Sequence, residues 1–172
     1  MITPEWEQRM ADAWASFDER AEAEFLLLVE QIVAELPPGD PVGLFERGGS
    51  LDSVGQTELA VPLYRQALAA GLSGSRRRQA VIQLASSLRS LGEPQESITL
   101  LTAEQAAGSD ELDDAVKTVL ALALTDVGRE REAVSIAVGA LAAHLPLYRR
   151  SMTNYARQLL DPAPEQVPNH HP

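Results

Sequence analysis

The stretch LDSVGQTELAV, residues 51–61, has two counterparts in this chain: LRSLGEPQESI at residues 88–98 and LTDVGREREAV at residues 124–134. In each stretch a leucine lies four residues before a glycine, and a small residue followed by an apolar one comes five places after it. The glycines Gly55, Gly92 and Gly128 are 37 and 36 residues apart. A period in this range predicts stacked helical hairpins, which build an extended surface for binding another chain.

The composition favours helices over a sheet. Of the 172 residues, 45% are apolar but only 5% are aromatic, and alanine and leucine dominate. Residues of this kind allow close helix–helix packing, whereas sheets favour β-branched and aromatic residues. The length suffices for one well-packed domain. Because the chain contains no cysteine, disulfides, a thiol nucleophile and a cysteine-based zinc site are excluded.

The net charge of −11 argues against nucleic acid and anionic membranes as partners. Residues 1–40 carry ten carboxylates and only two arginines. These carboxylates form either solvated helix faces or a surface for a basic partner. The first residues lack the basic start of a signal peptide, and the apolar run Phe25–Val29 is too short to span a bilayer. We therefore expect a soluble, cytoplasmic protein.

Capping residues, prolines and glycines predict where the helices begin and end. Thr3-Pro4 and Asp40-Pro41 are each an N-cap followed by a proline suited to the first turn. Residues 1–40 are expected to form two helices, with Ser16 and Glu19 as a capping box that restarts the chain. The expected hairpins pair 41–54 with 57–70, 75–91 with 94–106, and a helix from about Ser109 with one ending near Ala143. A last helix is expected over 147–160, and the proline-rich residues 161–172 are expected to form a loose tail.

The three hairpins resemble tetratricopeptide repeats, with units that start at Pro41, Arg78 and Asp114. Small and apolar residues stand at the family's signature places: Gly48, Leu51, Gly55, Ala60, Tyr64 and Ala67; Leu84, Ala85, Leu88, Gly92, Ser97 and Leu101; Leu120, Ala121, Leu124, Gly128, Ala133, Ala137 and Ala140. The family's tryptophan is replaced by Leu44, Val81 and Lys117. QLASSLRSLG, residues 83–92, also resembles small bacterial members whose function is mostly unassigned.

The resemblance implies an all-α, right-handed solenoid of about three repeats over residues 41–160. Residues 1–40 would pack on or cap its beginning, and the last helix would cap its end. In this family the first helix of each hairpin lines a concave groove that holds a protein or peptide. The positions that would line this groove are Phe45, Gly49, Asp52, Ser53, Gln79, Ile82, Gln83, Ser86, Arg89, Ser90, Thr118, Val119, Leu122, Thr125 and Asp126.

Two arginines are candidates for recognising an acidic ligand. Arg78 and Arg89 are three helical turns apart and share a face, so they are placed to clamp a carboxylate or an acidic peptide. The alternative is that Arg89 pairs with Asp52 or Asp126 and only sets the packing of the repeats. The binding hypothesis requires uncompensated polar groups in the groove, notably Arg89 and Gln83.

Two alternatives to partner binding stay open. The apolar stripe Trp6, Met10 and Phe17 either pairs with its copy in a homodimer or folds back to cap the first repeat. A small-molecule pocket closed by the N-terminal helix is the other alternative.

No motif in the sequence predicts chemistry. Arg76-Arg77-Arg78 is interpreted as a solvated helix start and not as a phosphate site. His144 is alone, and His170-His171 has no partner carboxylate, so no metal is expected. The sequence lacks a glycine-rich phosphate loop, a His-Glu-x-x-His motif and a nucleophile elbow, so neither an enzyme nor a cofactor is predicted.

Overall fold

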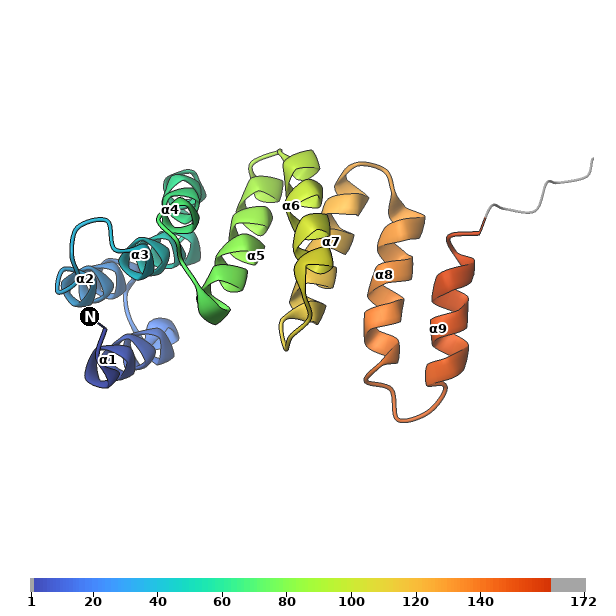
Figure 1. Cartoon of the computed structure of the whole chain (residues 1–172), viewed down its shortest axis with the longest axis horizontal. Coiled ribbons are helices and arrows are strands. Elements are labelled where there is room, and N and C mark those ends of the chain that lie inside the picture. The colour runs from blue at the N-terminus through green and yellow to red at the C-terminus, as the bar shows by residue number, and fades with distance from the viewer. Residues whose placement is uncertain (1, 162–172) are drawn as a thin grey trace, which may run out of the picture.

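The computed structural model describes residues 2–161, which form nine α-helices stacked along one axis (Figure 1). The helices are α1 (Pro4–Ala15), α2 (Glu22–Val33), α3 (Pro41–Ser53), α4 (Thr57–Ala69), α5 (Gly74–Ser90), α6 (Pro94–Ala107), α7 (Asp113–Asp126), α8 (Glu130–Ala142) and α9 (Arg149–Gln158). A short 3-10 helix, Phe17–Glu19, lies between α1 and α2. The all-α solenoid predicted from the sequence is confirmed. The expected tail lies outside the described residues, except for Asp161.

The repeated sequence stretch forms a repeated helix stop. Gly55, Gly92 and Gly128 have φ angles of 78°, 85° and 75°, in the left-handed region that glycine adopts at least cost. The residue after each glycine donates its N–H to the carbonyl of the leucine four places before that glycine, at 2.9 Å in all three turns. This hydrogen bond satisfies a carbonyl that the helix end would leave unpaired. The leucine and the glycine therefore act together to end the first helix of each hairpin.

Small residues let neighbouring helices approach one another closely. Ala60 and Ser97, five places after the turn glycines, are completely buried. A Cβ atom on Gly48 of α3 would lie 2.9 Å from the ring of Tyr64 on α4, so no larger residue fits there without a shift. Each following hairpin then packs on both helices of the one before: α5 on α3 and α4, and α7 on α5 and α6.

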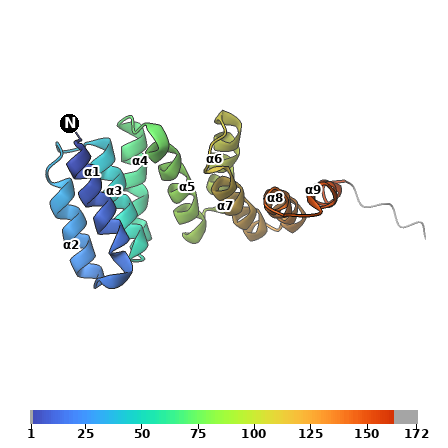
Figure 2. The same ribbon diagram turned by 90° about the horizontal axis from the view of Figure 1, so that it is seen from below.

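The two N-terminal helices form a further hairpin that packs on α3 through α2, as Figure 2 shows from below. Its core includes Trp6 and Met10 of α1 and Phe25 and Val29 of α2. The expected capping box is wrong: Ser16 ends α1 and donates its hydroxyl to the carbonyl of Ala13, at 2.9 Å. The chain uses residues 16–21 to reverse direction, and α2 begins only at Glu22.

Two helices near the C-terminal end, α7 and α9, also begin later than expected. α7 starts at Asp113, because Ser109 donates its hydroxyl to the Asp113 carboxylate, at 2.5 Å, and does not cap the helix. α9 starts at Arg149, directly after Tyr148, whose φ of 67° is left-handed. Within the part of the chain that the structure describes, Tyr148 is the one residue other than glycine with a positive φ.

Candidate functional site

A hollow of about 440 Å³ lies between α1, α3 and α5, which are the first helices of three successive hairpins. We call it the inner hollow. It combines aromatic, amide and charged side chains, and its lining residues are Glu7, Met10, Ala11, Trp14, Phe45, Glu46, Gly49, Ser75, Arg76, Gln79 and Gln83.

A network of charged groups holds α1 over the other two helices. Arg76 of α5 donates to both carboxylate oxygens of Glu7, at 2.8 and 2.6 Å, and its Nε donates to Glu46 of α3, at 2.9 Å. Trp14 of α1 donates its indole N–H to the other oxygen of Glu46, at 2.8 Å. Glu46 is only 3% exposed, so both of these donors are needed to compensate its burial.

The electrostatic consequence is that the arginine in the inner hollow is already neutralised. The hydrogen bonds that Arg76 donates to Glu7 hold the pKa of this carboxyl below its usual range, and the same bonds raise the pKa of Arg76. Two carboxylates therefore surround one guanidinium. The hollow offers no free cation for an acidic ligand at this position.

Gln83 of α5 is the side chain in the inner hollow with an unmet hydrogen-bonding group. Its Oε1 is buried and receives no hydrogen bond from any group in residues 2–161. Gln79 lies one helical turn earlier and also lines the hollow. The two amides form a polar strip beside the aromatic rings of Trp14 and Phe45.

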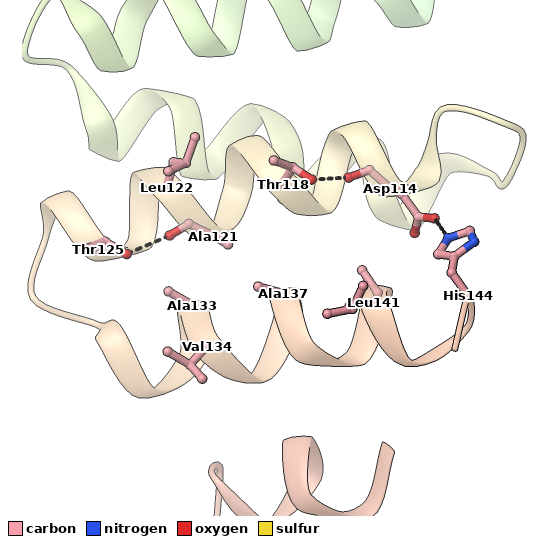
Figure 3. Close-up of a pocket in the computed structure, with 11 residues that line it drawn as sticks. Asp114, Thr118, Ala121, Leu122, Thr125, Ala133, Val134, Ala137, Leu141 and His144 are labelled. Atoms are coloured by element: carbon pink, nitrogen blue, oxygen red, sulfur yellow. Dashed lines mark hydrogen bonds and ion pairs between the residues drawn. The ribbon is translucent and has the colours of Figure 1, made fainter. Parts of the chain in front are cut away.

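A second hollow, also of about 440 Å³, lies between α7 and α8. We call it the end hollow, and Figure 3 shows the side chains of α7 and α8 that line it. Its lining is mostly apolar: Ala121, Leu122, Ala133, Val134, Ala137, Ala140 and Leu141, with Thr118, Thr125, Asp114 and His144. Asp114 Oδ2 and His144 Nε2 are 2.7 Å apart at one end (Figure 3). Hydrogen bonds from His144 and then Lys117 hold the pKa of Asp114 below its usual range.

The comparison with protein families agrees with this architecture. A family model described as tetratrico peptide repeat matches residues 41–159, most of the chain. The chain belongs to the tetratricopeptide repeat family. Such repeats generally mediate protein–protein interaction or scaffolding, and they are typically non-enzymatic.

Solved structures show the same fold at low sequence identity. The tetratricopeptide-like repeats of a putative kinesin light chain from Podosopora anserina are 24% identical, with a TM-score of 0.67, over 92% of this chain and 89% of that one. The MamA protein of Desulfovibrio magneticus RS-1, residues 41 to the end, is 18% identical, with a TM-score of 0.62, over 92% and 93%. No curated protein matches the chain by sequence.

Two other kinds of site are absent from residues 2–161. No helix there is long and apolar enough to cross a membrane. The same residues hold no group of three or more histidine, aspartate or glutamate side chains placed to hold a metal ion.

Seven of the fifteen positions that the family resemblance assigned to one groove line one or the other of the two hollows. Phe45, Gly49, Gln79 and Gln83 line the inner hollow, and Thr118, Leu122 and Thr125 line the end hollow. The remaining positions line neither: Asp52, Ser53, Ile82, Ser86, Arg89, Ser90, Val119 and Asp126. Asp52 instead accepts a hydrogen bond from Ser87 of α5, at 2.8 Å, so it joins α3 to α5.

The expectation that Arg89 is uncompensated is wrong. Its Nε lies 2.6 Å from Asp126 Oδ2 on α7, which is one of the two pairings that the sequence allowed. Arg78 is equally engaged: only 6% exposed, it pairs with Asp113 at 2.7 Å and Asp110 at 2.9 Å. Both arginines join α5 to the next hairpin, and the carboxylate clamp has no free arginine at either position.

The run Arg76-Arg77-Arg78 makes more contacts than the solvated helix start expected from the sequence. Arg76 forms ion pairs with Glu7 and Glu46, and Arg77 forms one with Glu104. Arg78 pairs with acidic residues of the next hairpin. Trp14, Glu46 and Arg76 line the candidate site but were not predicted from the sequence. No sequence signal distinguished Glu46, because α3 also carries the charged residues Arg47 and Asp52.

The apolar stripe of α1 is not exposed. Trp6 is 3% exposed and Met10 is 2% exposed, and Phe17 stacks edge-to-face on Phe25 with ring centroids 4.8 Å apart. The Trp6 indole N–H donates to the carbonyl of Ile32 in α2, at 2.9 Å. Trp6 and Met10 are therefore folded back within their own chain, one of the two arrangements that the sequence left open, whereas Phe17 is half-buried.

Proposed function

We propose that this protein is an interaction module that holds a segment of a partner protein in the inner hollow. The family supplies the general expectation, since tetratricopeptide repeats commonly bind other proteins. The position of the hollow supports it, because two of its three helices, α3 and α5, are ones that the family resemblance assigns to the binding groove.

The observation that carries the proposal is the unpaired Oε1 of Gln83. Leaving a buried acceptor without a donor costs about 1–3 kcal/mol, and this cost is removed when the Gln83 amide turns its oxygen toward the hollow and a ligand supplies an N–H group. A main-chain amide of an extended segment is such a donor. Gln79, one turn away, offers a second amide to the same segment, while Trp14 and Phe45 provide apolar contact.

The charge of the hollow selects the kind of segment. Because Glu7 and Glu46 already neutralise Arg76, an acidic peptide gains no free cation there. An uncharged segment avoids the cost of removing its own charges from water. We therefore infer a neutral partner segment and not the acidic peptide considered from the sequence.

The test uses the substitution Gln83→Leu in the full chain. Leucine has a similar size, removes the unpaired oxygen and so leaves the fold at least as stable, while it removes the hydrogen bond to the partner. The matched control is Gln105→Leu, at an exposed position of α6. Tagged wild-type and variant chains are used to capture proteins from cells that produce this protein, with mass spectrometry as the readout.

The expected result is a specific protein captured equally by wild type and Gln105→Leu. Its yield falls about fivefold to tenfold with Gln83→Leu, the loss expected for one hydrogen bond. Equal capture by the two variants contradicts the proposal, as does the absence of any specific protein with wild type.

A further inference from the structure

The hairpin formed by α7 and α8 lacks the helix that covers the equivalent surface of the α3–α4 and α5–α6 hairpins. α5 packs on both α3 and α4, and α7 packs on both α5 and α6. α9 packs on α8 but, in residues 2–161, has no comparable packing on α7. Figure 1 shows the same order, with α8 lying between α7 and α9.

The repeat register shows which surface is uncovered. Tyr64 of α4, Leu101 of α6 and Ala137 of α8 are 37 and 36 residues apart, so they hold the same place in their hairpins. Tyr64 and Leu101 are completely buried, because the next hairpin covers them, whereas Ala137 is exposed and lines the end hollow. The end hollow is therefore an unfilled docking site for a following helix.

α9 lies instead on a face of α8 that the earlier hairpins leave exposed. Ser135 and Ala142 of α8 are 7% and 1% exposed, but Thr99 and Ala106, at the same places in α6, are exposed. The left-handed Tyr148 precedes α9 and redirects the chain at this point. A bulky residue adopts this conformation at a cost, so the surrounding packing must hold it there.

We propose that α9 of a second copy of this chain fills the end hollow. Seven of the ten large apolar side chains that are exposed in residues 2–161 belong to this end of the molecule: Leu122, Val134, Leu141, Leu147, Tyr148, Tyr155 and Leu160. Three of them line the hollow. Of the others, Tyr155 is presented by α9 itself, whereas the left-handed Tyr148 lies just before the helix.

The two faces of α9 can serve two purposes at once. Ala156 is 4% exposed and packs α9 on its own chain, while Tyr155 is 57% exposed. Earlier helices fill the equivalent site with apolar residues one turn apart, such as Leu84 and Leu88 in α5. The exposed ring of Tyr155 on α9 offers apolar surface of the same kind to a partner copy.

Charge complementarity supports the same occupant. Arg78 and Asp113 form an ion pair at 2.7 Å where the second hairpin meets the third. The residues 36 places later are Asp114 and Arg149, the same pair with its signs reversed. Within one chain they do not meet: Asp114 binds Lys117 and His144, and Arg149 donates to the carbonyl of Leu145, at 2.6 Å. α9 carries three arginines and no acidic residue, whereas Asp114 lies at one end of the hollow.

This proposal shares no residue with the inner hollow, so it stands or falls independently of the partner site. Its first test is the oligomeric state of the full chain, measured by light scattering over an about hundredfold range of concentration. A reversible dimer is expected. Ala137→Arg, which places a long charged side chain in the hollow, is expected to weaken it at least about tenfold. The control is Ala103→Arg, at an exposed position of α6, which leaves the dimer unchanged.

A charge exchange identifies the contact. Asp114→Arg and Arg149→Asp are each expected to weaken the dimer, and the chain that carries both is expected to recover it. Recovery is a result that mere damage to the fold does not produce. A wild-type chain that stays monomeric, or a dimer that Ala137→Arg does not weaken, overturns the proposal.

Cross-linking gives the geometry directly, because the natural chain has no cysteine. Chains with Ala137→Cys are mixed with chains with Tyr155→Cys and oxidised gently. A disulfide-linked pair of the two variants is expected. Chains with Leu59→Cys, an exposed position of α4, replace the Ala137 variant in the control. A yield no higher than in this control means that α9 does not reach the end hollow of another copy.

Discussion

Arg76 donates two hydrogen bonds to Glu7, a residue 69 positions earlier in the chain. This contact joins the N-terminal hairpin to α5, past the whole hairpin formed by α3 and α4. Because Arg76 also bonds Glu46 of α3, one guanidinium ties three helices together around the inner hollow. The shape of the proposed binding site therefore depends on an ionic contact that no local sequence pattern defines.

The Glu7–Arg76 pair is expected to stabilise the fold in a pH-dependent manner. The pKa of Glu7 is lowered in the folded state, so its contribution is present above the ordinary glutamate value of about 4.3 and is lost as the pH falls through the lower folded-state value. Glu7→Gln should lower the free energy of unfolding by about 0.5 kcal/mol at pH 7, as expected for a half-exposed pair. Urea unfolding of both chains at pH 7 and pH 3 measures this, and a difference that is larger at pH 3 would contradict it.

Glu46 should matter more than Glu7, because it is buried. Glu46→Gln replaces one accepting oxygen by an N–H group that faces donors from Trp14 or Arg76, with an expected loss of about 2 kcal/mol. Trp14→Phe removes one donor and keeps the ring, so its loss should be about 1 kcal/mol. Chemical unfolding of the two variants gives the order, and a larger loss for Trp14→Phe would be inconsistent with this assignment.

Two glycines inside helices should respond in opposite directions to alanine. Gly48→Ala forces a methyl group against the Tyr64 ring and should destabilise the protein by about 1–3 kcal/mol. Gly139→Ala meets no atom within 4 Å and should stabilise α8 by about 0.5–1 kcal/mol, because alanine loses less backbone entropy. Thermal unfolding of both variants provides the measurement. If Gly48→Ala leaves the melting temperature unchanged or raises it, the close contact at Gly48 is refuted.

The two arginines that join α5 to the next hairpin should differ in importance. Arg78 is buried among several carboxylates, so Arg78→Ala leaves uncompensated charge and should cost about 3 kcal/mol. Arg89 is about a third exposed and has one partner, so Arg89→Ala should cost about 0.5 kcal/mol and retain the helical circular dichroism spectrum. Urea unfolding compares them, and equal losses would count against the difference in burial as the cause.

The local structure of this protein followed from its sequence. The helix starts at Pro4 and Pro41 and the turns at Gly55, Gly92 and Gly128 were predicted from residues close together in the chain, because caps and left-handed turns are local interactions. The period of the three stretches predicted the solenoid for the same reason, since each hairpin repeats one set of local contacts. The family resemblance also identified Gln83, whose side chain the groove leaves unpaired.

Tertiary structure alone decided which side chains meet. The ion pairs of Arg76 with Glu7 and Glu46 join residues 69 and 30 positions apart, and either carboxylate could have faced solvent on the sequence pattern alone. The division of the groove into two hollows likewise depends on where two elements lie: α1 over α3 and α5, and α9 away from α7. Those positions follow from packing and from one left-handed residue, Tyr148. The sequence therefore determined the repeating unit, whereas the long-range packing of its two ends determined the surfaces available for binding.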